Sequence, residues 1–148
     1  MLECPVMKRI SAKSTVYLID GSNFSRSFWD RRQGEKPDAL EAEFLDWLDE
    51  ISRLELLSAS CFRVVFDGGF RPVRSLANPA ISVHFSGDES ADDFLLERSY
   101  FLVTEGARCV IVSNDREIRE KAAAEKVKSI PCEVFYRLCD AELKKGNR

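Results

Sequence analysis

The sequence predicts an α/β fold in which a mainly parallel sheet is covered by helices on both faces, giving three α/β/α layers. Apolar runs typical of strands, such as residues 15–19, 61–66 and 107–112, alternate with segments whose apolar residues recur at helical spacing. The nearly continuous apolar run at 107–112 indicates a strand buried on both faces. The alternation of strands and helices implies a mainly parallel sheet, and right-handed crossovers then fix most of its topology. Functional residues are expected beyond the carboxyl ends of the strands.

The first half of the chain contains three strand-like segments and one clear helix. The strand at residues 15–19 ends at Asp20-Gly21, where residues that break regular structure follow. A polar stretch at 31–37 precedes a helix beginning near Asp38, and Asp38 and Glu41 have the spacing of an N-cap and its N3 partner. The strand at 61–66 ends at Asp67, and residues 81–85 alternate as a strand does.

The second half continues the alternation. A helix opens at Ser90, and its predicted buried stripe is Phe94, Leu95, Phe101 and Leu102. After the strand at 107–112, we expect a helix at about 115–125 and a short strand at 127–130. A last helix begins near Pro131.

Length and composition suit one domain, residues 1–148, with 1–13 and 142–148 as flexible ends. The net charge of −3 means that nucleic-acid binding would need a local basic patch. The N-terminal residues contain no apolar run of signal-peptide or membrane type. An odd number of cysteines without a C-x-x-C pair, together with the single His84, favours reduced thiols in the cytoplasm over a zinc site. His84 alternates with apolar strand residues, so we expect it to be packed or solvent-facing rather than a general base.

Acidic residues stand where the predicted strands end. Asp20, Asp67 and Asp115 follow three strands, and Asp92 and Asp93 lie in the first turn of a helix. In a parallel sheet these carboxylates share one edge, where they repel one another unless a cation neutralises them. Oxygen ligands without His or Cys suit Mg²⁺ or Mn²⁺.

Each of these acids also has a purely structural interpretation. Asp20-Gly21 and Asp67-Gly68 are turn dipeptides, and Ser90 with Asp93 matches a capping box. Asp92 would favour the helix dipole, and Asp115 would cap the helix that it opens. The recurrence of acids at strand ends favours a shared site over this set of separate roles.

Four short motifs follow one another along the chain: YLIDGSN at 17–23, VFD at 65–67, ESAD at 89–92 and IVSNDRE at 111–117. In this order they resemble the motifs of NYN domains, and in particular of the YacP-like branch of the PIN-like nuclease superfamily, and the resemblance covers about residues 15–140. The resemblance implies a metal-dependent ribonuclease in which Asp20, Asp92 and Asp115 are metal ligands or catalytic residues. It gives Asn23 a positioning role, and Asp67 and Asp93 are further candidate ligands. The chain departs from the family pattern at residues 78–87.

Arginines follow the acidic motifs and are candidates for phosphate contacts, since Arg binds phosphate bidentately. The predicted RNA-binding residues are Arg26, Arg31, Arg32, Arg71, Arg74 and Arg116. Aromatic residues are interleaved with these arginines and are candidates for stacking on unpaired bases, namely Phe24, Phe28, Trp29 and Phe70.

We therefore expect an endoribonuclease that cleaves single-stranded RNA by attack of a metal-activated water, because no Ser, Cys or His is placed for a covalent route. The alternative is a PIN-like domain that binds RNA or the ribosome without cutting, and DNA stays open as a substrate. A receiver-like domain with Asp67 as phosphoacceptor is disfavoured, because the first strand lacks the usual acidic pair. Asp92 and Asp93 would also have no role in it.

Overall fold

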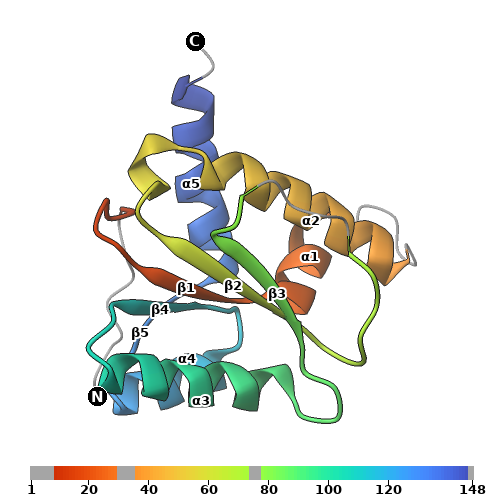
Figure 1. Ribbon diagram of the computed structural model, residues 1–148, viewed down its shortest axis with the longest axis vertical. Helices are drawn as coiled ribbons and strands as arrows, with labels where there is room; N and C mark the ends of the chain where they lie inside the picture. The colour runs from red at the N-terminus through yellow and green to blue at the C-terminus, as the bar shows by residue number, and fades with distance from the viewer. Residues whose placement is uncertain (1–8, 30–35, 74–77, 147–148) are drawn as a thin grey trace.

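The computed structural model describes residues 9–29, 36–73 and 78–146. Figure 1 shows a central sheet between two layers of helices. The elements of the described residues are, in chain order, β1 (Val16–Asp20), α1 (Gly21–Trp29), α2 (Pro37–Ser52), the 3₁₀ turn η1 (Glu55–Leu57), β2 (Cys61–Phe66), β3 (Ile81–Phe85), α3 (Ala91–Thr104), β4 (Cys109–Val112), α4 (Arg116–Ala124), β5 (Lys128–Ile130) and α5 (Cys132–Gly146).

The sheet has the strand order β3-β2-β1-β4-β5, and each neighbouring pair of these strands is parallel. The predicted parallel α/β fold is therefore confirmed. The order differs from the 2-1-3-4-5 order of flavodoxin-like and receiver domains, so the receiver interpretation is wrong. Parallel β2, β1 and β4 are adjacent, which brings the residues after their carboxyl ends to one edge of the sheet.

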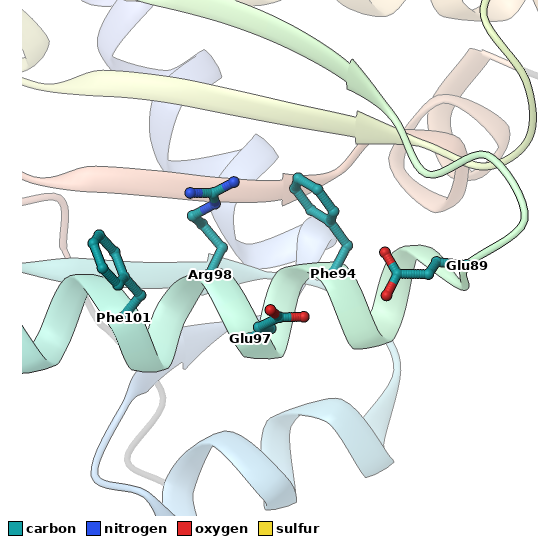
Figure 2. A pocket seen from close by; sticks show the side chains of 5 residues that line it. All are labelled: Glu89, Phe94, Glu97, Arg98 and Phe101. Carbon is teal, nitrogen blue, oxygen red and sulfur yellow. The ribbon is translucent and has the colours of Figure 1, made fainter.

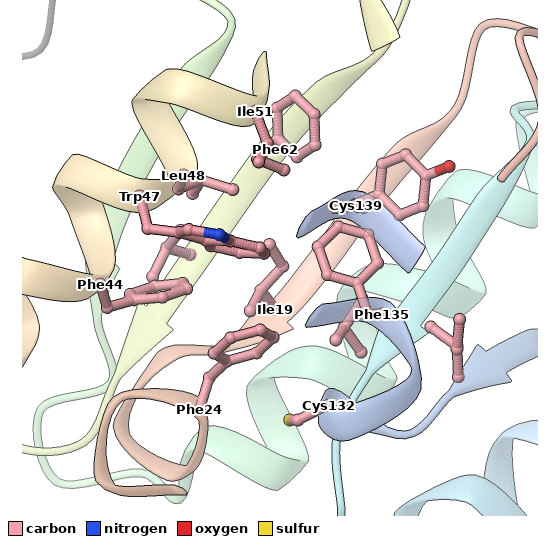
Figure 3. Packing of buried hydrophobic residues seen from close by; sticks show 14 of the residues in the cluster. Ile19, Phe24, Phe44, Trp47, Leu48, Ile51, Phe62, Cys132, Phe135 and Cys139 are labelled. Carbon is pink, nitrogen blue, oxygen red and sulfur yellow. The ribbon is translucent and has the colours of Figure 1, made fainter. Parts of the chain in front are cut away.

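Alternation along the strands divides the core between the two faces of the sheet. Tyr17 and Ile19 of β1 face the layer of α1, α2 and α5, while Leu18 faces the layer of α3 and α4. The first layer is rich in aromatic rings; Figure 3 shows Phe24, Trp47 and Phe135 brought together from its three helices. Both faces of the central strands are thus covered, as their continuous apolar sequences require.

Helix α1 follows β1 without a connecting loop, and the sequence pattern does not predict it, because Asp20-Gly21 indicates only the end of a strand. Gly21 is the first residue of α1 and is buried. A Cβ atom at Gly21 would lie 2.6 Å from side-chain atoms of Phe66 and Val64, both fully buried in β2. Glycine is therefore needed here for the close approach of α1 to the sheet.

Gly21→Ala is expected to destabilise the fold by about 1–3 kcal/mol, because the added methyl group has no free volume in a packed core. Urea denaturation measures the change in the free energy of unfolding. Gly69→Ala is the matched control, since a Cβ there meets nothing within 4 Å. Equal stabilities of the two variants would show that α1 can shift to accept the methyl group.

Several local predictions are corrected by the structure. Helix α2 begins at Pro37 with Lys36 as an N-cap that makes no side-chain bond, so the N-cap role predicted for Asp38 is wrong. Phe101 of α3 is 56% exposed instead of buried. Residues 142–146, predicted as part of a flexible end, form the last turn of α5. In the described part of the chain, no helix combines the length and hydrophobicity of a membrane span.

Candidate active site

The carboxyl edge of the sheet gathers the predicted acidic residues. Asp20 is the last residue of β1, Asp67 follows β2, Asp92 lies in the first turn of α3 and Asp115 is the N-cap of α4. Their charges interact: Asp20 is affected by Asp67 and Asp92, and Asp92 by Asp115 and Asp67. The structure thus brings together four acids that are up to 95 positions apart in the sequence.

Asp20 is the most deeply buried of these acids, with 5% of its surface exposed. Burial raises its pKa from 3.8 to about 6; the backbone N–H of Asn23 opposes the shift, and the charges of Asp67 and Asp92 add to it. That N–H donates to Oδ1 of Asp20 over 3.3 Å. Among the described residues Asp20 forms no ion pair, so its negative charge is not neutralised by a contacting cation.

Asp92 and Asp115 form a second crowded pair. Burial raises the pKa of Asp92, and the charge of Asp115 and a side-chain hydrogen bond with Asp115 raise it further. Two ionised carboxylates this close repel each other, and a cation bound between them would relieve the repulsion. Asp115 also accepts from the N–H of Glu117 over 2.9 Å, which confirms its capping role. Capping uses one oxygen and leaves the other available.

Asp67 is exposed at the tip of β2 and is held by backbone contacts. Its N–H donates to Oγ of Ser22 over 2.9 Å, and its Oδ1 accepts from the N–H of Ala91 at the start of α3 over 3.4 Å. Ser22 was not singled out in the sequence, although it lies inside the motif that contains Asp20. Asp67 therefore links β2 to the helix that carries Asp92.

Asn23 contributes to the site through its backbone. The side-chain oxygen of Asn23 accepts a bond from Ser27 over 3.3 Å, whereas its N–H is the donor to Asp20. Asn114, which the sequence did not single out, accepts from the N–H of Cys132 over 2.8 Å and donates to Ser27 over 3.4 Å. Asn114 thereby ties the end of β4 to the start of α5 and to the last turn of α1.

The remaining acid and the arginines lie around this edge. Asp93 is exposed beside Asp92, and its N–H donates to Oγ of the N-cap Ser90, as the capping pattern predicted. Arg26 is exposed on α1, where its charge acts on Asp20. Arg116 is exposed and paired with Glu120 over 3.1 Å. Arg31, Arg32 and Arg74 lie outside the described residues.

Arg71 is held within the protein. Its guanidinium bonds both carboxylate oxygens of the buried Glu41 and donates to the carbonyl oxygens of Asp67 and Gly69 over 3.1 and 2.9 Å. It also lies 4.8 Å from the centre of the Phe85 ring. Arg71 thus fixes the turn after β2, a role that the sequence did not reveal.

The aromatic residues predicted to stack on bases differ in burial: some belong to the core and one lies on the surface. Phe24 is fully buried in the core of the α1 layer, and Phe28 and Trp29 pack against that core. Phe70 is 84% exposed beside the Asp67 turn. Phe24 is therefore a core residue, Phe28 and Trp29 are half-buried, and Phe70 is the most exposed ring of this set.

The acidic edge offers oxygen ligands but no preformed metal site among the described residues. Within the ranges that the structure describes, no three His, Cys, Asp or Glu side chains are arranged so that they would hold a metal ion. The chemistry nevertheless fits a divalent cation, because Asp20 is buried without a cationic partner and Asp92 contacts another carboxyl group. Burial raises the pKa of Cys109 and Cys132 to about 12, so these thiols stay protonated and are poor nucleophiles.

The sequence matches no protein-family model and no curated protein. Solved structures do match: two crystal structures of Rae1 (YacP) from Bacillus subtilis, one of them a tryptophan-to-leucine mutant, superpose on 90% of this chain. The mutant gives a TM-score of 0.71 over 79% of its own chain, and the other structure gives 0.70 over 78%. Both are 14% identical to this chain, a level at which the likeness concerns the fold. The chain therefore has the PIN-like, three-layer α/β/α fold of the YacP type.

Proposed function

We propose that this chain is a metal-dependent ribonuclease that cleaves single-stranded RNA, with Asp20, Asp92 and Asp115 as the residues that hold Mg²⁺ or Mn²⁺. The observation that carries the proposal is the convergence of acids at the carboxyl edge, where Asp20 is buried without an ion pair among the described residues. Such crowding is unfavourable for the isolated protein and is relieved by a bound cation. Asp67 and Asp93 are the further candidate ligands.

In this proposal, side chains and backbone groups of the protein orient the metal-binding acids and hold the RNA beside them. The N–H of Asn23 orients Asp20, and the cap contact with Glu117 orients Asp115. Arg26 is exposed near Asp20 and suits a phosphate of the RNA backbone, and the exposed Phe70 suits a stacked base. When bound, Mg²⁺ or Mn²⁺ supplies activation of water and stabilisation of the leaving oxygen.

A second candidate function is RNA or ribosome binding without cleavage. Two observations favour it. The first is that the described acids are not arranged as a ready-made metal-binding group. The second is that Asp67 and Asp115 each accept a backbone hydrogen bond that a structural role would explain.

The deciding experiment is cleavage of labelled single-stranded RNA, and of DNA of the same sequence, with Mg²⁺, with Mn²⁺ or with EDTA. We expect RNA cleavage with either metal and none with EDTA. Asp140→Asn is the matched control that should cleave normally, because Asp140 lies on α5 and, among the described residues, forms an ion pair only with the exposed Lys144. RNA binding without cleavage under every metal condition would favour the second function.

A further inference from the structure

One part of the sheet is left uncovered on the α3 side. A cavity of about 300 Å³ lies there between α3 and the strands β1, β2 and β3. It is lined by Leu18, Arg63, Ser82, His84, Phe94 and Arg98. Ser82 and His84 of β3 are only half-buried, which agrees with incomplete cover of this edge.

The lining of this cavity is basic. Arg63 comes from β2 and Arg98 from α3, the lining includes no carboxylate, and neither arginine forms an ion pair with another described residue. Burial lowers the pKa of His84, and the charges of Arg63 and Arg98 lower it further. The two guanidinium groups thus create a local positive region in a chain whose net charge is −3.

Aromatic rings accompany these arginines along α3. Figure 2 shows Phe94, Arg98 and Phe101 extending from one side of the helix toward the strands. The guanidinium carbon of Arg98 lies 5.5 Å from the centre of the Phe94 ring, and Phe101 is 56% exposed. An adjoining cavity of about 270 Å³ is lined by these three residues and by Glu89 and Glu97.

The row of side chains starts in the first turn of α3, the turn that also carries Asp92. Side chains two residues apart on a helix point to different sides, so Asp92 faces the other acids while Phe94 faces the cavity. Phe101 lies about 13 Å farther along the helix axis than Asp92, at 1.5 Å per residue. A chain that passes from the acidic edge over the first turn of α3 therefore reaches Phe94 and then Arg98 and Phe101. Alternating rings and guanidinium groups are the elements that bind single-stranded nucleic acid without sequence preference.

We propose that the α3 groove, defined as Arg63, His84, Phe94, Arg98 and Phe101, binds the part of a single-stranded RNA that continues from the cleavage site. This proposal rests on the proposed function and adds a substrate-binding surface to it. Arg63 and Arg98 contact backbone phosphates, and Phe101 stacks on a base. Phe94 supports Arg98 by its ring contact.

The test is binding of a fluorescein-labelled, mixed-sequence single-stranded RNA in EDTA, followed by fluorescence anisotropy over a series of salt concentrations. The double variant Arg63→Met with Arg98→Met keeps much of each apolar stem and removes both charges. Loss of two phosphate contacts should make the slope of the logarithm of the association constant against the logarithm of the salt concentration shallower by about 1.4. Arg63→Lys with Arg98→Lys should restore most of the slope.

The matched control is Arg53→Met with Arg137→Met, which removes two exposed charges from the opposite helical layer and should leave the slope nearly unchanged. Phe101→Ala should weaken binding roughly 5- to 100-fold through lost stacking, at an unchanged melting temperature.

Two outcomes would overturn the proposal that the α3 groove binds RNA. One is equal salt slopes for the groove variant, its control and the wild type; the other is no RNA binding by the wild type at low salt. Neither outcome decides the proposed function, because cleavage with metal is measured in the separate assay. If the wild type binds RNA through the α3 groove but cleaves it with neither metal, the nuclease proposal is refuted and the groove proposal stands.

Discussion

Asp92→Asn is expected to lower the rate of RNA cleavage by on the order of 10³-fold while the melting temperature stays the same or rises slightly. The activity falls because asparagine removes the charge of a proposed metal ligand, and losses of single electrostatic groups in active sites reach this size. The stability does not fall, because Ser90 still caps α3 and the substitution removes a like charge beside Asp115. Cleavage rates and thermal unfolding of the same preparations measure both effects.

The opposite changes in activity and stability separate the two interpretations of Asp92. A residue that served only the helix dipole would lose a little stability on replacement by asparagine and leave activity intact. Asp140→Asn is the control for the change in net charge. If Asp92→Asn cleaves RNA at the wild-type rate, Asp92 is not a ligand, and Asp93→Asn then tests its exposed neighbour.

Asp20→Asn is expected to stabilise the metal-free protein by roughly 3 kcal/mol at pH 7, which corresponds to a pKa raised from 3.8 to about 6 in the folded state. The folded protein binds the proton of Asp20 more tightly than the unfolded chain does. Ionisation of Asp20 therefore costs folding free energy, and the cost grows as the pH rises from about 4 and is complete above about 6. Asparagine keeps an oxygen acceptor for the N–H of Asn23 without the charge.

The measurement is urea denaturation of wild type and Asp20→Asn in EDTA between pH 4 and 7. Other carboxyl groups titrate in both proteins, so the difference between them isolates Asp20. We expect the difference to be small near pH 4 and largest near pH 7. Added Mn²⁺ should stabilise the wild type and not the variant, because binding to the folded state adds stability. A difference that does not change with pH would contradict a raised pKa at this site.

The acidic site was predictable in part from the sequence alone. Asp20 and Asp67 come directly after apolar runs and Asp115 comes three residues after another, and parallel strands present such positions at one edge. The capping roles of Ser90 and Asp115 were also visible locally, because capping depends on neighbours a few residues away. Asn114 was not identified, because its partners are Ser27 and Cys132 on other elements.

Arg71 shows that the sequence can also indicate a role that tertiary contacts change. In the sequence it follows an acidic motif and suits phosphate binding, and in the structure its guanidinium is bonded to Glu41, which is 30 positions away. A side chain with five donors binds whichever acceptor the fold places nearest, and local spacing carries no information about that acceptor. Gly21 is similar, since the need for glycine comes from the packing of Phe66 and Val64 against α1.

The sequence by itself determined the class of the fold and the edge at which the acids meet, because strand and helix periodicities and the handedness of crossovers depend on local stereochemistry. The tertiary structure alone decided the strand order β3-β2-β1-β4-β5 and the cover of each face. Periodicity marks Phe101 as part of an apolar stripe, but whether another element covers that stripe depends on how many helices pack on that face. On the α3 side the cover ends before β3, and this leaves Phe101 and the arginine-lined groove open to solvent.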